Sequence, residues 1–143
     1  MTDSDSPERD ERSIEAAARD LTWRLEAIFE SESVLATYVL RGGLPVVSFQ
    51  HAELDELPRT VVTHTSQLLV EIDPRLDDET EPKVHTLVGS YRVTVMRIGP
   101  RPLGYHVGVM IEADSPIEHS LWRLLRQLDR AFRKRLAADP DDP

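Results

Sequence analysis

The sequence predicts one α+β domain whose elements follow the order α-β-β-α-β-β-β-α. Three segments repeat apolar residues with the helical period, and five short runs are apolar or alternate with a period of two. Glycine-containing turns separate two pairs of these runs. The length of 143 residues suits a single domain with its own hydrophobic core.

The first half of the chain predicts a helix followed by a β-hairpin. Residues 14–29 carry an apolar stripe of period 3.6, and Ser13 is a plausible N-cap. Strands are expected at 34–40 and 44–49, joined by a turn at Arg41-Gly42-Gly43. Pro45 has no backbone N–H to donate, so it belongs at the start of its strand or on a sheet edge.

The second half predicts a helix at 54–72, a strand pair, a fifth strand and a last helix. Pro58 is tolerable in the first turn of the middle helix, which puts the N-cap near Asp55, and Asp73-Pro74 ends the helix. Strands at 84–88 and 91–98 are joined through Gly89-Ser90, and the strand at 105–111 places its odd-numbered residues on one face. The last helix follows Ser115 as N-cap, Pro116 at the first helical position and a capping-box glutamate, Glu118.

Charge and composition restrict the possible functions. Three acidic segments, residues 1–13, 73–83 and 137–143, account for the formal net charge of −9, so the rest of the chain is neutral. We predict an acidic disordered tail at 1–12, one domain at 13–136 and a second acidic tail at 137–143. The charge disfavours nucleic acid, the absence of cysteine and of a leading apolar run favours the cytoplasm, and no segment predicts a membrane span.

No constellation of residues predicts catalysis, a metal site or a cofactor. The five histidines stand in separate elements, without the spacing of a metal-binding pair. Arg41-Gly42-Gly43 leads into a strand, whereas phosphate-binding loops open a helix, and a serine nucleophile motif is missing. Trp23 and Trp122 stand beside helical stripes, so partial burial in the core is expected for both.

The middle helix shows more apolar surface than one sheet needs. Leu54, Leu57, Val61, Thr65, Leu68 and Ile72 form a stripe that would pack on the sheet. A second flank adds Val62, Leu69 and Val70, with the small residues Thr63 and Ser66 between them. The run at 84–88 would leave its backbone free to pair with another chain if it is an edge strand. We therefore predict a homodimer interface formed by Val62, Ser66, Leu69, Val70, Val84, Thr86 and Val88.

The pattern resembles the roadblock/dynein-light-chain family, in the longin and profilin-like group. The resemblance rests on the element order over residues 14–136, the hairpin Val39-Leu40-Arg41-Gly42-Gly43-Leu44-Pro45-Val46-Val47-Ser48, and the strand at 105–111 running through Ala113-Asp114-Ser115 into a long helix. It implies a five-stranded antiparallel sheet with the first and last helices on one face and the middle helix on the other. It also implies a non-enzymatic protein that dimerises through the middle helix and third strand.

Members of that family commonly regulate or anchor small Ras-like GTPases, and some bacterial members stimulate them. The resemblance therefore implies a Ras-like GTPase as a partner, with Arg59 and Arg101 as candidates for an arginine supplied in trans. Two alternatives stay open at this level. One is a small acidic chaperone like those of type III secretion, which typically place three strands before the middle helix; this chain places two. The other is a small-molecule sensor on a profilin-like scaffold, with its ligand between sheet and helices.

Overall fold

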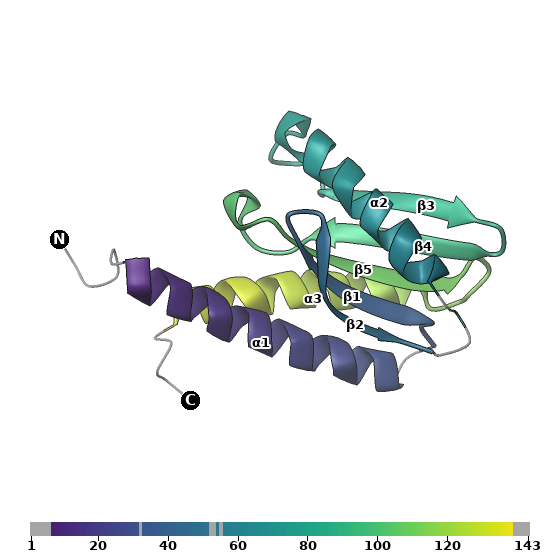
Figure 1. Ribbon diagram of the computed structural model, residues 1–143, viewed down its shortest axis with the longest axis horizontal. Coiled ribbons are helices and arrows are strands. Elements are labelled where there is room, and N and C mark those ends of the chain that lie inside the picture. The colour runs from purple at the N-terminus through teal and green to yellow at the C-terminus, as the bar shows by residue number, and fades with distance from the viewer. Residues whose placement is uncertain (1–6, 32, 52–53, 55, 139–143) are drawn as a thin grey trace.

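The computed structural model describes residues 7–31, 33–51, 54 and 56–138. Five strands form one antiparallel sheet in the spatial order β2-β1-β5-β4-β3, which confirms the α+β class. Two helices, α1 and α3, cover one face of the sheet, and α2 covers the other (Figure 1). The bounds are α1 Pro7–Ser31, β1 Ala36–Arg41, β2 Leu44–Gln50, α2 Leu57–Ile72, β3 Lys83–Val88, β4 Tyr91–Arg97, β5 Tyr105–Glu112 and α3 Glu118–Ala137, with single 3-10 turns at Asp73–Arg75 and Arg101–Leu103.

The two predicted hairpins form where the turn glycines stand. Gly42 and Gly43 join β1 to β2 with φ of 62° and 81°, and Gly89, with φ of 57°, begins the two-residue turn between β3 and β4. These left-handed conformations suit a tight turn whose twist matches the flanking strands. Pro45 lies on the edge strand β2, where the register with β1 shifts by one residue, so its missing N–H costs no ladder bond inside the sheet.

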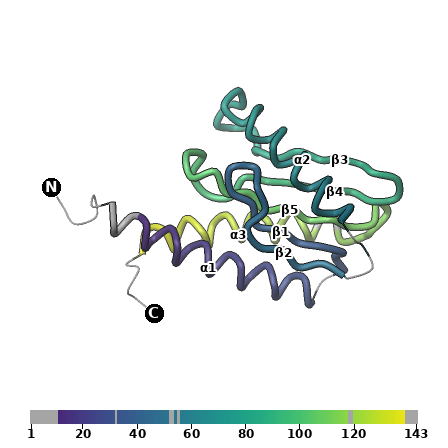
Figure 2. Tube along the Cα trace, viewed as in Figure 1, coloured from purple at the N-terminus to yellow at the C-terminus, as the bar shows by residue number. Residues whose placement is uncertain are grey.

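Two hydrophobic cores lie on the two faces of the sheet. The alternation predicted for the fifth strand is confirmed, because Tyr105, Val107, Val109 and Ile111 of β5 lie in the core beneath α1 and α3. Met110 points to the other side and belongs to the core beneath α2, together with Tyr38, Leu40, Val62, Leu69, Val93 and Val95. The domain therefore has three layers, with α2 on one side of the sheet and α1 and α3 on the other, and the tube view traces the chain through them (Figure 2).

The helix starts differ from the sequence expectations. Helix α1 begins at Pro7, six residues before the predicted cap at Ser13, because a proline followed by acids is itself a favourable helix start. Helix α2 has Glu56 as its N-cap, and the predicted cap Asp55 lies outside the described residues. Helix α3 starts after Ile117 rather than Ser115. The Ser115 hydroxyl accepts only a long 3.4 Å bond from the backbone N–H of Ile117, so it caps a turn that precedes the helix.

Candidate interaction surface

Helix α2 is rotated relative to the expected orientation: it turns the predicted second flank toward the sheet, and Thr65 belongs to both the expected and the observed buried face. Its buried residues are Pro58, Val62, Thr65, Ser66 and Leu69, whereas Leu57 and Leu68 are 43% and 46% exposed. The prediction that Val62, Ser66 and Leu69 lie in the dimer interface is therefore wrong, since all three are fully buried within the monomer. The physical reason lies in β5, where Gly108 has no side chain: a Cβ at that position would lie 2.5 Å from Cγ1 of Val62. The gap above this glycine admits the Val62 side of the helix.

Polar contacts beneath α2 match the same rotation. The hydroxyls of Thr65 and Thr86 lie 2.9 Å apart, and Oγ of Ser66 shares a 2.7 Å hydrogen bond with Nδ1 of His106. Burial of the imidazole lowers the pKa of His106 from 6.5 to about 4, while Asp73 opposes this shift and Arg97 adds to it. The ring is therefore neutral in the folded protein near pH 7, which suits a site shared with a neutral hydroxyl.

An ion pair holds the C-terminal end of α2. Oδ1 of Asp73, just past the last turn, accepts a 2.5 Å bond from Nη1 of Arg97 and a 3.3 Å bond from Nε of Arg101. The carboxylate side chain is only 6% exposed and that of Arg97 15% exposed. Because removing either partner would leave a buried charge uncompensated, this contact resists sliding or rotation of the helix.

The rotation leaves an apolar groove between α2 and the edge strand β3. Strand β3 pairs with β4 and forms the outer edge of the described sheet. The groove has a volume of about 290 Å³. Its lining comes from Thr60, Val61, His64, Thr65 and Leu68 of α2 and Thr86 and Val88 of β3.

The other residues of the predicted interface occupy different surroundings. Val84 of β3 packs against the core beneath α2. Val70 is 43% exposed and lies on the far flank of α2, near Gly43 of the first hairpin. Of the seven residues proposed from the sequence, the structure therefore places Thr86 and Val88 in the groove. It adds Val61, which is half-buried against the core, and the exposed His64 and Leu68. The helical periodicity did not reveal this groove, because apolar residues surround most of the helix.

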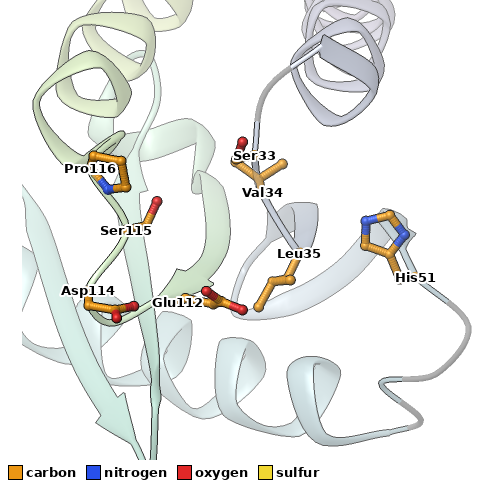
Figure 3. A pocket seen from close by; sticks show the side chains of 8 residues that line it. All are labelled: Ser33, Val34, Leu35, His51, Glu112, Asp114, Ser115 and Pro116. Atoms are coloured by element: carbon orange, nitrogen blue, oxygen red, sulfur yellow. The ribbon is translucent and has the colours of Figure 1, made fainter.

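A second hollow lies at the end of the sheet where β1 begins and β5 ends. Its volume is about 490 Å³, and it is lined by Ser33, Val34, Leu35, His51, Glu112, Asp114, Ser115 and Pro116. Figure 3 shows His51 on one side of this opening and the carboxylates of Glu112 and Asp114 on the other. The His51 ring packs against Phe29 in a tilted arrangement, with 5.0 Å between the centroids and 41° between the ring planes. Within the described part of the chain no three histidine or acidic side chains gather in a way that could hold a metal ion.

The two tryptophans differ in environment. Trp122 on α3 is half-buried, with Nζ of Lys83 3.7 Å from its ring centroid and the His85 ring packed edge-on at 4.9 Å. The expectation for Trp23 is wrong, because its side chain on α1 is 69% exposed. None of the helices in the described ranges is long and apolar enough to span a membrane.

The fold is that of roadblock/LC7 domains, as the sequence resemblance implied. No family model and no curated protein matches the sequence. Solved structures that share the fold include the three described next. MglC from Myxococcus xanthus is 18% identical, with a TM-score of 0.54 over 80% of this chain and 97% of its own. The roadblock/LC7 domain from Streptomyces avermitilis is 14% identical, with a TM-score of 0.59 over 81% and 97%. MglB in a tetrameric arrangement is 11% identical, with a TM-score of 0.54 over 83% and 92%.

Proposed function

We propose that this chain is a non-catalytic, homodimeric protein-interaction module that regulates or anchors a small Ras-like GTPase. The observation that carries the proposal is the apolar groove between α2 and β3, because it lies directly beside an open strand edge. A second copy of the chain can fill the groove and pair with the edge at the same time. We propose further that the protein is cytoplasmic and that it binds no nucleic acid, membrane, metal or cofactor.

The dimer would place two α2 helices antiparallel and join two β3 strands into one continuous sheet. Val61 and Leu68 stand one on each side of His64 in the groove, so an antiparallel pair brings the apolar residues of one copy onto those of the other. Burying a side chain such as Leu68 stabilises an association by roughly 1–2 kcal/mol per copy, since about half of its surface is already covered. Thr86 and Val88 add strand contacts at the same seam.

The GTPase role rests on the fold and on the family resemblance. A partner without chemistry of its own can stimulate hydrolysis by ordering the switch loops of the GTPase, or by supplying an arginine. The two arginine candidates lie in different surroundings. Both are exposed, but Arg101 is bonded to Asp73 and to the backbone carbonyl of Leu76, which restrain its side chain. Arg59 is therefore the better placed of the two to reach a partner.

Sedimentation or light scattering at micromolar concentration tests the dimer. The unmodified chain is expected at the mass of two copies, and the double variant Val61→Asp, Leu68→Asp at the mass of one, because it places charges in the apolar seam. Val46→Asp is the matched control, since Val46 is 61% exposed on the opposite sheet edge and should leave the dimer intact. A monomeric unmodified chain would refute the homodimer.

The GTPase role needs a second assay. The protein is mixed with the Ras-like GTPase encoded beside its gene, in each nucleotide state, and binding is measured by calorimetry and hydrolysis by phosphate release. A preference for one nucleotide state, or a changed rate, supports the proposal. No binding to either state contradicts the GTPase role, and a stable complex with a secreted protein or a co-purifying small molecule would favour the chaperone or the sensor instead.

A further inference from the structure

A second apolar groove lies on the opposite side of the molecule, between α1 and α3. The two helices lie side by side, and the start of α1 and the end of α3 are at the same end of the molecule, so they run antiparallel (Figures 1 and 2). The groove has a volume of about 260 Å³. It is lined by Trp23, Arg24, Ala27, Ile28, Leu124, Gln127 and Leu128.

Side-chain size and direction explain why this seam is open. Ile28 and Leu128 are buried and form its floor. Ala27 is too small to fill the space above them, and Leu124 covers it only in part. Trp23 is large enough to close the groove, but 69% of its surface faces solvent. An exposed tryptophan beside an apolar hollow is typical of an anchor for a binding partner, because indole buries a large apolar area with few rotatable bonds.

The charges along the groove indicate the chemistry of its occupant. The α3 ridge that borders the groove carries Arg123, Gln127, Arg130 and Lys134, all exposed and spaced along one line of the helix. On α3, the acidic side chain that the structure describes is that of Asp129. It faces away from the groove, and its Oδ1 accepts a 2.7 Å hydrogen bond from the backbone N–H of Gly99. On α1, Arg24 is bonded to Asp20 at 2.7 Å and so adds no net charge. The α3 side of the groove is therefore positive although the chain as a whole carries −9.

We propose that the groove between α1 and α3 binds an amphipathic helix of another protein, with a bulky apolar face and an acidic edge. A third helix laid along two antiparallel helices can set its apolar ridge into the seam, with side chains against Trp23, Leu124 and the floor. Its carboxylates then lie beside Arg123 and Arg130 on the α3 ridge. The recess below the two helix ridges suits a protruding side chain better than a flat lipid surface.

This surface is separate from the groove between α2 and β3, since the sheet lies between them (Figure 1). Binding here therefore does not depend on the proposed homodimer. The monomer-forming double variant Val61→Asp, Leu68→Asp is expected to keep its affinity for the helix, which makes failure of this inference distinguishable from failure of the proposed function.

The test uses a displayed library of 18-residue amphipathic helices with a fixed leucine face and randomised polar positions, selected on the full chain. Enriched sequences are expected to carry an excess of Asp and Glu along one edge. The most enriched peptide is then synthesised and titrated by calorimetry, together with a partner in which each acid is replaced by lysine. The lysine peptide is expected to bind at least about tenfold more weakly.

Three variants locate the binding. Trp23→Ala and the double change Arg123→Glu, Arg130→Glu are each expected to weaken the acidic peptide by about tenfold or more. Trp23 is largely exposed, so its removal should leave folding intact, which circular dichroism checks. Leu87→Ala is the matched control, because Leu87 is 65% exposed on β3 and should not change affinity.

Several outcomes would overturn the inference. They are a selection that yields no binder, enriched peptides without an acidic excess, or affinity unchanged by Trp23→Ala. Sedimentation with phosphatidylserine vesicles tests the alternative that this face binds a membrane. If the chain binds these vesicles through Trp23 and does not bind the selected peptide, the face is a membrane surface and the proposal of a helical partner is wrong.

Discussion

Burial of His106 beneath α2 predicts that the protein loses stability in mild acid. The imidazole is 2% exposed, and its pKa is lowered from 6.5 to about 4 in the folded state. An unfolded chain binds a proton below about pH 6.5, whereas the folded chain resists it until about pH 4. The stability associated with the neutral ring is therefore complete above the unfolded pKa and is lost as the pH falls toward the folded one.

The two pKa values set the size of the effect. One pKa unit corresponds to about 1.4 kcal/mol, so the full loss from this residue is about 3 kcal/mol, of which about 2 kcal/mol has occurred by about pH 5. Measurements above pH 5 separate the effect of His106 from that of Glu81. Hydrogen bonds from Arg126 and Lys83 lower the pKa of Glu81 to about 2, so its contribution to stability is lost only at lower pH.

Urea unfolding followed by circular dichroism, at a constant protein concentration, measures the effect at about pH 7.5 and about pH 5. His106→Asn can keep a hydrogen bond to Ser66 but does not titrate. This variant is expected to be less stable near neutral pH and to lose about 2 kcal/mol less than the unmodified chain on acidification. His51→Asn, at an exposed position away from the groove between α2 and β3, is the matched control and should keep the loss. An equal loss in His106→Asn and the unmodified chain would refute the reasoning.

Four further changes test other parts of the structure. Gly108→Ala should lower the free energy of unfolding in urea by about 1–3 kcal/mol, because the new Cβ meets Val62, and adding Val62→Ala should recover part of the loss. Asp73→Ala should cost about 3–5 kcal/mol in the same assay by stranding Arg97; a cost under about 1 kcal/mol would contradict the role of the ion pair. Arg59→Ala should reduce stimulated phosphate release at least about tenfold if this arginine enters the GTPase site, and an unchanged rate would exclude it. Deleting residues 1–6 and 139–143, the outer parts of the two predicted acidic tails, should move the melting temperature in a fluorimetric scan by less than about 2 °C, and a larger drop would show that these residues contribute to the fold.

Much of the fold could be predicted because the signals that carry it are local. The alternation in β5 and the glycines at 42–43 and 89 act within a few residues, and each formed the element that was expected. The helix starts were less accurate, since several neighbouring residues can begin a helix at similar cost. Pro7 shows this for the first helix and Ile117 for the last.

The rotation of α2 could not be predicted from its own residues. Apolar residues surround most of this helix, so two faces satisfied the periodicity about equally well. Residues of β3 and β5 decide which face of α2 meets the sheet. Gly108 opens space for Val62, while Thr86 and His106 provide hydrogen-bond partners for the hydroxyls of Thr65 and Ser66. Trp23 is a similar case, because its neighbour α3 lies a hundred residues away in the sequence, and only the packed pair shows that the indole stays outside.

The sequence by itself determined the class of the fold, the order of its elements and the absence of a recognisable catalytic motif, because periodicity, turn chemistry and motif spacing are properties of short segments. The tertiary structure alone decided which residues form surfaces. Exposure depends on what a distant segment places against each side chain, so Val62, Ser66 and Leu69 became core, while Val61, Leu68 and Trp23 remained on the two apolar grooves.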